Sequence, residues 1–158
     1  MAKYRLPLLL PLLVIGACAT ATEVDWDRVS LSTDLTSYAI GQDAGVTLTN
    51  ASGRIVHYSW CVLGVEQRVQ GEWVYASGAY LVRWVSEGFF GPNHNVILGD
   101  ECDFHPLPWR ASVTHLLPTP PYDPNLEPGP EYRYVIATMG PNFEERAVVH
   151  SASFAITP

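Results

Sequence analysis

The stretch "LEPGPEYRY", residues 126–134, ends a proline-rich passage and opens a run with the composition of a β-strand. Proline fixes φ and glycine accepts positive φ, so Pro128 and Gly129 predict a tight turn. Tyr132 and Tyr134 follow at alternate positions, as the buried side chains of a strand do. We therefore expect the chain to turn sharply here and to enter a strand with one buried face.

These residues also resemble a known structural motif. Leu126, Pro128, Gly129 and Tyr132 reproduce the L-x-P-G-x-x-Y pattern of the tyrosine corner in fibronectin-type and related immunoglobulin-like sandwiches. The resemblance implies that Leu126 is the last core residue before the chain crosses between two sheets. It also implies that the Tyr132 hydroxyl bonds to backbone a few residues upstream. The alternative is a proline-rich loop followed by an unrelated strand.

Alternating strands separated by turn residues recur along the rest of the chain. Residues 27–34 ("DRVSLSTD") and 44–50 ("AGVTLTN") alternate apolar and polar side chains, and no window shows a sustained helical period. We count seven to nine strands, which predicts an all-β protein folded as one sandwich. The expected core residues are Val29, Leu31, Val46, Leu48, Val56, Tyr58, Trp60, Val113, Tyr132, Tyr134, Ile136, Val148 and Phe154.

One β-hairpin is expected within residues 65–76, "VEQRVQGEWVYA". Gln70 and Gly71 supply the turn, because glycine favours the positive φ that a two-residue hairpin turn requires. In this arrangement we expect Val69 to face Trp73.

Three longer segments extend the resemblance to a family. They are "SYAIGQDAGVTLTNASGRIVHYSWC", the "LEPGPEYRYVI" strand and the closing "RAVVHSASFAI". Together, over residues 28–156, they resemble bacterial secreted immunoglobulin-like domains of unknown role and, more distantly, the intracellular proteinase inhibitor domain of bacilli. The resemblance implies a single immunoglobulin-like or fibronectin-type β-sandwich over residues 28–158. Residues 77–108 depart from the family's shorter pattern, so we expect an insertion at about 85–109.

The N-terminus has the form of a secretory signal. Lys3 and Arg5 precede an apolar run that is too short to span a bilayer, which predicts a signal peptide over residues 1–17. The order "IGAC" ending at Cys18 resembles the lipobox of bacterial lipoproteins, and the resemblance implies that Cys18 carries a lipid. The alternative is an ordinary cleavage site that happens to include a cysteine. Residues 18–27 would then form the lipidated N-terminus and a short tether.

The charge of the mature chain bears on its partners. Removing residues 1–17 takes away two of the nine basic residues and no acidic one, so the net charge falls from −7 to near −9. Nucleic-acid binding requires clustered lysine and arginine to neutralise phosphates. We therefore expect no nucleic acid partner.

The two remaining cysteines, Cys61 and Cys102, form an even pair in an oxidising compartment. We expect a disulfide between them that fastens the insertion to the sandwich. The alternative is two free thiols.

Chemistry-bearing motifs are scarce. Asp100, Glu101, Asp103 and His105 lie close together in the sequence, but their spacing matches no established metal loop, and solvated loop acids are the expectation. The chain has no G-x-S-x-G, no H-E-x-x-H and no phosphate-binding glycine loop. The sequence therefore predicts no enzyme activity, no metal and no cofactor.

These observations favour a non-catalytic binding module of the cell envelope. We expect the lipid anchor to hold it on the periplasmic side of the outer membrane or at the cell surface, because Ala19 does not resemble an inner-membrane retention signal. Its partner would be an envelope protein or polymer. The alternatives are a secreted protease inhibitor presenting the stiff loop at residues 118–125 and, third, a hydrolase of envelope polymers.

The expected partner-facing residues are the aromatics of the insertion. Phe89, Phe90, Phe104 and Trp109 lie in or at the end of a segment longer than most connections, and aromatic side chains dominate interface energetics. The alternative is that these aromatics fold inward as a satellite core.

Overall fold

The structure, a computed structural model, describes residues 23–78, 102–118 and 128–158. These residues form two β-sheets, preceded by one turn of 3-10 helix, η1 (Trp26–Arg28). The strands are β1 (Val29–Thr33), β2 (Ser37–Ala39), β3 (Asp43–Asn50), β4 (Val56–Val69), β5 (Glu72–Gly78), β6 (His105–Leu107), β7 (Ser112–Pro118), β8 (Glu131–Met139), β9 (Arg146–His150) and β10 (Phe154–Thr157). The prediction of an all-β protein is confirmed, but the described residues form ten strands, more than the seven to nine expected.

The two sheets differ in size. The smaller has the order β1-β3-β7 and is antiparallel throughout. The larger has the order β2-β10-β8-β4-β5, with β6 added to β4 and β9 added to β8. Its one parallel pair joins β2 to β10, from opposite ends of the described chain. Within the described ranges, no helix is long and apolar enough to cross a membrane.

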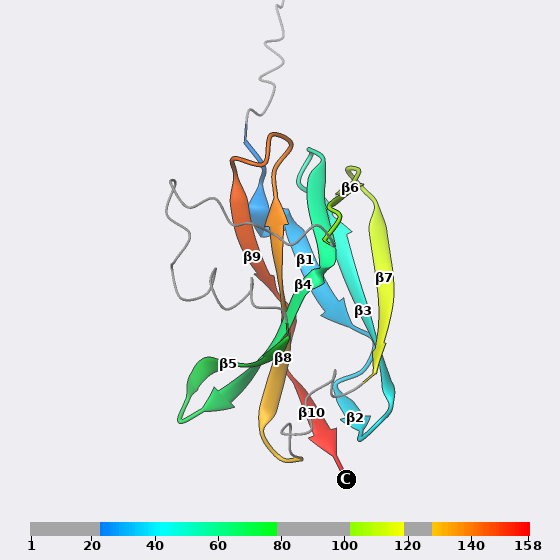
Figure 1. The fold of residues 1–158 in the computed structure, drawn as a ribbon, viewed down its shortest axis with the longest axis vertical. Helices are drawn as coiled ribbons and strands as arrows, with labels where there is room; N and C mark the ends of the chain where they lie inside the picture. The colour runs from blue at the N-terminus through cyan, green and yellow to red at the C-terminus, as the bar shows by residue number, and fades with distance from the viewer. Residues whose placement is uncertain (1–22, 79–101, 119–127) are drawn as a thin grey trace, which may run out of the picture.

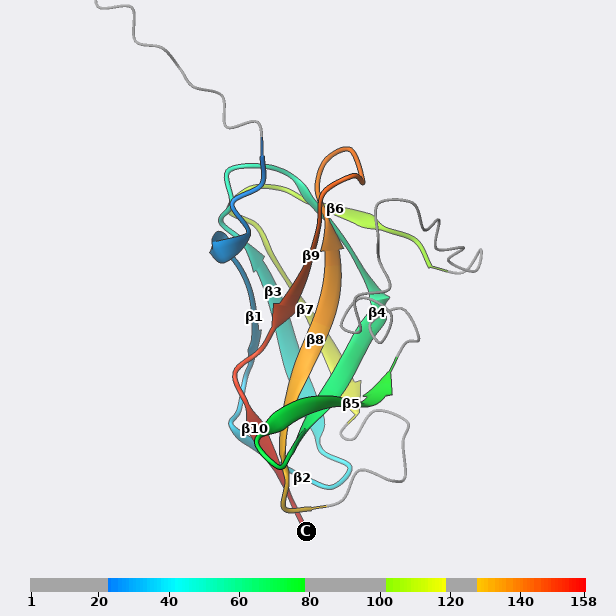
Figure 2. The same ribbon diagram turned by 90° about the vertical axis from the view of Figure 1, so that its left-hand side faces the viewer.

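The two sheets share one hydrophobic core, which lies between them (Figures 1 and 2). The smaller sheet contributes Leu31, Val46 and Leu48, and the larger contributes large side chains such as Tyr134 and Phe154. Tyr134 stacks on Phe154 with ring centroids 4.9 Å apart. The alternation of the strands explains this arrangement, because every second side chain of each strand points inward.

The hairpin between β4 and β5 forms where the sequence predicts it. Gln70 and Gly71 occupy its turn with φ of 53° and 91°, the two positive values of a type I′ turn. The expected contact of Val69 with Trp73 is wrong: Val69 lies opposite Glu72, and Trp73 lies opposite Arg68. Because side chains alternate along a strand, this register puts Val69 and Trp73 on different faces of the sheet.

Most of the expected core residues are buried, with three differences. Trp60 and Val113 are half-buried and pack against the core from its margin. Val148 is also half-buried, and its neighbour Val149 takes the core position instead. The cause is the register of β9, which places Val149 directly opposite the buried Ile136.

The carboxylate of Asp34 fixes the end of the smaller sheet at which β3 begins. The Tyr38 hydroxyl and the Gly45 N–H both donate hydrogen bonds to Asp34 Oδ1, at 2.5 and 2.9 Å. The Leu35 N–H donates in turn to the Tyr38 hydroxyl. The hydrogen bond from Tyr38 holds the pKa of Asp34 below its usual value, and burial raises the pKa of Tyr38. The cluster connects β2 of the larger sheet to β3 of the smaller one.

Replacing Gly45 with alanine should destabilise this junction. An added Cβ would lie 2.9 Å from both Cγ and Oδ2 of Asp34, so the carboxylate would have to leave its donors. We expect a loss of about 1–2 kcal/mol in the free energy of unfolding, measured by urea denaturation. In an Asp34→Ala background the same substitution should cost much less; an equal cost in both backgrounds would contradict this explanation.

Candidate interaction face

Two strands of the larger sheet carry the same short pattern, Glu-x-Arg. It occurs at Glu66 and Arg68 in β4, and at Glu131 and Arg133 in β8. The antiparallel register pairs Glu66 with Arg133, and the next in-phase position brings Arg68 to Glu131. Each carboxylate therefore faces a guanidinium, on the side of the sheet opposite the core.

Two more residues complete this surface. Trp73 of β5 lies opposite Arg68, and His150 of β9 lies opposite Val135 of β8, two residues from Arg133. Residues opposite each other in neighbouring strands share a face. We call the surface formed by Glu66, Arg68, Trp73, Glu131, Arg133 and His150 the charged face. Figure 1 shows the β4–β5 hairpin, which carries three of these residues, projecting from the body of the molecule.

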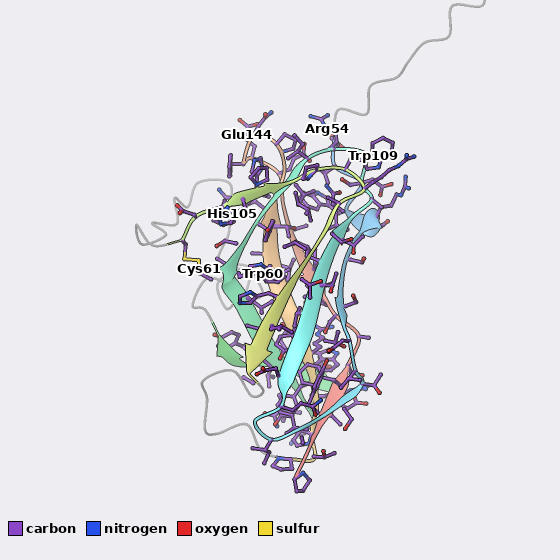
Figure 3. The ribbon with its side chains drawn as sticks, turned by 90° about the vertical axis from the view of Figure 1, so that its right-hand side faces the viewer. Arg54, Trp60, Cys61, His105, Trp109 and Glu144 are labelled. Carbon is purple, nitrogen blue, oxygen red and sulfur yellow. A yellow bond between two sulfur atoms is a disulfide. The ribbon has the colours of Figure 1, made fainter. Side chains whose placement is uncertain are left out.

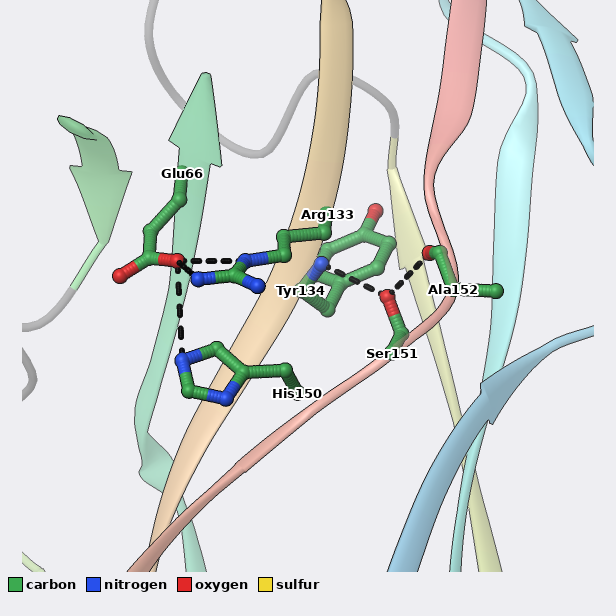
Figure 4. Close-up of polar contacts among 6 residues, drawn as sticks. All are labelled: Glu66, Arg133, Tyr134, His150, Ser151 and Ala152. Atoms are coloured by element: carbon green, nitrogen blue, oxygen red, sulfur yellow. Dashed lines mark hydrogen bonds and ion pairs between the residues drawn. The ribbon is translucent and has the colours of Figure 1, made fainter. Parts of the chain in front are cut away.

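The central ion pair of the charged face is buried. The Arg133 Nε–H donates a hydrogen bond to Glu66 Oε2 at 2.6 Å, and Arg133 Nη2 forms an ion pair with the same oxygen at 2.6 Å (Figure 4). The Glu66 side chain is only 5% exposed, and that of Arg133 is 21% exposed. A buried carboxylate depends on such a partner, because removing it from water costs several kcal/mol.

Both arginines of the charged face approach the ring of Trp73. The guanidinium carbon of Arg133 is 4.4 Å from the centroid of the Trp73 ring, and that of Arg68 is 5.9 Å away. Arg68 also pairs with Glu131 at 2.8 Å, with both side chains half exposed. Cations over an aromatic ring are attracted by its quadrupole. The indole and the two guanidinium groups therefore hold one another in a fixed arrangement.

His150 completes the contacts around Glu66. Its Nε2 atom is 3.7 Å from Glu66 Oε2. Burial lowers the pKa of His150, the positive charge of Arg133 lowers it further, and the Glu66 carboxylate opposes both. The neighbouring Ser151 hydroxyl accepts from the Tyr134 N–H and donates to the Ala152 carbonyl, which fixes the backbone beside His150 (Figure 4).

The lowered pKa of His150 predicts a dependence of stability on pH. An unfolded histidine takes up a proton as the pH falls through about 6.5. The folded state takes up that proton only at a lower pH. The contribution of His150 to the free energy of unfolding is therefore fully present above about pH 6.5, and it is lost as the pH falls towards the folded pKa. We expect the Tm to decrease between pH 7.5 and pH 5, and a His150→Gln variant to decrease less. An identical decrease in both proteins would contradict this assignment.

The disulfide prediction agrees with the structure. The sulfur atoms of Cys61 and Cys102 lie at bonding distance, with their Cα atoms 5.9 Å apart. The bond fastens the segment leading into β6 to the middle of β4, and Figure 3 shows it on the flank of the molecule, near Trp60. Trp60 stacks on His115 of β7, with ring centroids 5.3 Å apart.

The predicted partner-facing aromatics occupy different surroundings. Phe104 is half-buried, packs against the core and contacts Phe143 edge to face. Trp109 is 46% exposed and lies beside Arg110, whose guanidinium carbon is 4.1 Å from the centre of its ring. Phe89 and Phe90 lie outside the described residues.

Several other predicted residues also fall outside the described ranges. They are Cys18 with the whole of residues 1–17, Leu126, Asp100, Glu101 and most of the loop at 118–125. Within the part of the chain that the structure describes, no three potential metal ligands come together. Asp103 and His105 precede and begin β6, and both are exposed.

The described part of the expected tyrosine corner fits a turn into a strand. Gly129 has φ of 118°, and its N–H donates to the Ile156 carbonyl at 3.3 Å. Tyr132 is fully buried near the start of β8 and stacks on Phe154. The bond from the Tyr132 hydroxyl to upstream backbone stays a prediction.

The charged face is not among the features predicted from the sequence, because its ion pairs join residues of two strands that are distant in sequence. The two Glu-x-Arg patterns are visible in "VEQRV" and "PEYRY", 65 residues apart. Antiparallel pairing of these two segments gives complementary ion pairs in one register and like charges in the register shifted by two. The pattern would have predicted the pairing of β4 with β8.

Comparisons with known proteins give little further guidance. No protein-family model matches the chain, and no curated protein matches it. The chain is similar to a solved structure of the Pseudomonas fluorescens alkylpurine DNA glycosylase AlkC bound to DNA containing an abasic site analog, with a TM-score of 0.40 and 9% identity over 83% of this chain. The chain spans 31% of the length of that protein. A similarity at this level carries no argument about function.

Proposed function

We propose that the chain is a non-catalytic binding module of the bacterial cell envelope, an immunoglobulin-like β-sandwich held on a membrane by a lipid at Cys18. The resemblance of "IGAC" to a lipobox supports the anchor. Two sheets that share one core support the sandwich, and β-sandwiches serve many binding roles. The partner is an envelope protein or polymer.

The charged face is the observation that carries the binding role. Tryptophan and arginine are the side chains in which interface energy concentrates, and here the guanidinium groups of Arg68 and Arg133 both lie near the ring of Trp73. Their contacts fix these side chains before any partner arrives, which reduces the entropy lost on binding. The half exposure of Arg68 and Glu131 leaves polar groups at the margin for hydrogen bonds to a partner.

The binding role is tested by comparing two faces of the same molecule. A variant with Trp73→Ala and Arg68→Ala should lose a partner that the wild-type chain retains from detergent-solubilised envelope. The matched control is Thr114→Ala on the outer face of the smaller sheet, where Thr114 is exposed. Circular dichroism should show that all three proteins are folded. A partner retained equally by all three would overturn the assignment of the charged face.

The anchor is tested separately. In a bacterial host supplied with radiolabelled palmitate, the wild-type chain should incorporate label and sediment with membranes. A Cys18→Ser variant should do neither. Incorporation of label by the variant would show that the lipid is attached to a residue other than Cys18.

A further inference from the structure

The described chain begins at one end of the molecule. The Val24 N–H donates to Glu145 Oε2 at 2.9 Å, so this residue is fastened to the loop between β8 and β9. Figure 1 shows the chain entering here, beside the β3–β4 and β8–β9 loops, with the C-terminus at the opposite end. Five residues lead from Cys18 to Glu23, and even fully extended they span at most about 18 Å. A lipid on Cys18 would keep this end close to the bilayer.

This end also exposes apolar side chains from three separate loops. Ile55 of the β3–β4 loop and Trp109 of the β6–β7 loop are each 46% exposed, and Phe143 of the β8–β9 loop is 44% exposed. Among the described residues, Trp109 and Phe143 are the aromatic members of the set of large exposed hydrophobic side chains. Tryptophan favours the membrane interface, where its ring is apolar and its N–H reaches water.

Charged groups surround these side chains without giving the end a strong net charge. Arg54 and Arg110 lie in the same loops as Ile55 and Trp109, and guanidinium groups bind phosphate through paired hydrogen bonds. Figure 3 shows Arg54, Trp109 and Glu144 together at this end. Glu144 and Glu145 of the β8–β9 loop oppose the attraction of the two arginines to anionic lipids, so apolar insertion must supply most of the binding.

The loops hold these side chains in unusual backbone conformations. Arg110 and Phe143 have φ of 63° and 61°, in the left-handed region that side chains other than glycine rarely adopt. The third such residue in the described ranges is Gln70, in the hairpin turn. Arg110 is fixed there because its N–H donates to the Asn50 carbonyl at 2.7 Å. Strain of this kind persists where the surrounding structure enforces it, and it accumulates at functional sites.

The Asn50 side chain makes this end rigid from within. It is fully buried and donates to the carbonyls of Arg54 and Leu107, while it accepts from Ser52. These bonds connect the β3–β4 loop to β6 just before Trp109. The loops therefore present their apolar side chains as a preformed surface.

We propose that this end, formed by residues 52–55, 108–111 and 140–145, rests on the membrane, with Ile55, Trp109 and Phe143 among the phospholipid headgroups. The inference rests on the proposed anchor at Cys18, and it adds which end of the molecule faces the bilayer. The long axis then stands away from the bilayer, and the C-terminus and the β4–β5 hairpin point away from the lipid (Figure 1).

The test uses the lipidated chain in vesicles of phosphatidylethanolamine and phosphatidylglycerol whose acyl chains are brominated near the headgroup. Bromine quenches tryptophan fluorescence at short range, so the wild-type protein should be quenched relative to unbrominated vesicles. A Trp109→Phe variant should lose most of that quenching. The matched control, Trp73→Phe on the charged face, should keep it, and Ile55→Asp should weaken it with Trp109 in place.

Flotation of the same vesicles separates this proposal from the anchor. If the protein floats with the vesicles but quenching does not depend on Trp109, the docking proposal is overturned and the anchor stands. If the protein does not float, a Cys18→Ser chain with an N-terminal hexahistidine tag is tethered to vesicles that contain a nickel-chelating lipid. Quenching that depends on Trp109 would then support docking without the native lipid, and its absence would overturn it.

Discussion

Removing the Cys61–Cys102 bond should lower the free energy of unfolding by about 4 kcal/mol. The bond joins residues 41 apart in sequence, and closing a loop of this length restricts the unfolded chain far more than the folded one. For a domain of this size we expect the Tm to fall by roughly 10 °C. A Cys61→Ser plus Cys102→Ser variant, compared with wild type by urea denaturation, measures the loss.

The control is chemical reduction of the wild-type chain, which should reproduce the behaviour of the double variant. The variant itself should not respond to reductant. An unchanged Tm after reduction, together with two thiols that react with iodoacetamide, would contradict a stabilising role for the bond.

An Arg133→Met substitution should cost about 3 kcal/mol in the free energy of unfolding. Methionine retains most of the aliphatic length but leaves the Glu66 carboxylate 5% exposed with no guanidinium beside it. The carboxylate must then stay charged in a buried site or take up a proton, and either costs free energy. Urea denaturation at pH 7.5 measures the loss.

The same two strands supply a matched control. Arg68→Met removes the equivalent pair with Glu131, in which both side chains are half exposed, and should cost less than about 1 kcal/mol. Adding Glu66→Gln to Arg133→Met should recover part of the lost stability, because it removes the unpaired charge. Equal losses for Arg133→Met and Arg68→Met would show that burial does not set the value of these ion pairs.

The sequence predicts those elements of the fold that are determined by residues close together in the chain. The β4–β5 hairpin is predicted because Gln70 and Gly71 define its turn by themselves. Strands β2 and β6 are missed because each is three residues long and pairs with a strand that is distant in sequence. Pro106 lies in the middle of β6 and lacks an N–H, so composition alone argues against a strand there.

Which face of a sheet a single residue occupies also depends on pairing between distant strands. Two adjacent valines, Val148 and Val149, give no alternation to indicate which one points inward, and the pairing of Val149 with Ile136 decides it. Trp60 stays at the core margin because the register of β4 with β8 shifts between Tyr58 and Leu63. For the same reason the charged face is hidden in the sequence, since its ion pairs form only after two distant strands align.

The parallel pairing of β2 with β10 has a consequence for when the protein can fold. Residues 37–39 complete their edge of the larger sheet only by binding residues 155–157. Contacts between segments so far apart form slowly, because a long loop must close before any stabilisation is gained. During synthesis this edge of the larger sheet must therefore wait for nearly the whole described chain. Until then the backbone of residues 37–39 has no strand partner in the larger sheet, and an unpaired edge of this kind is open to pairing with other chains.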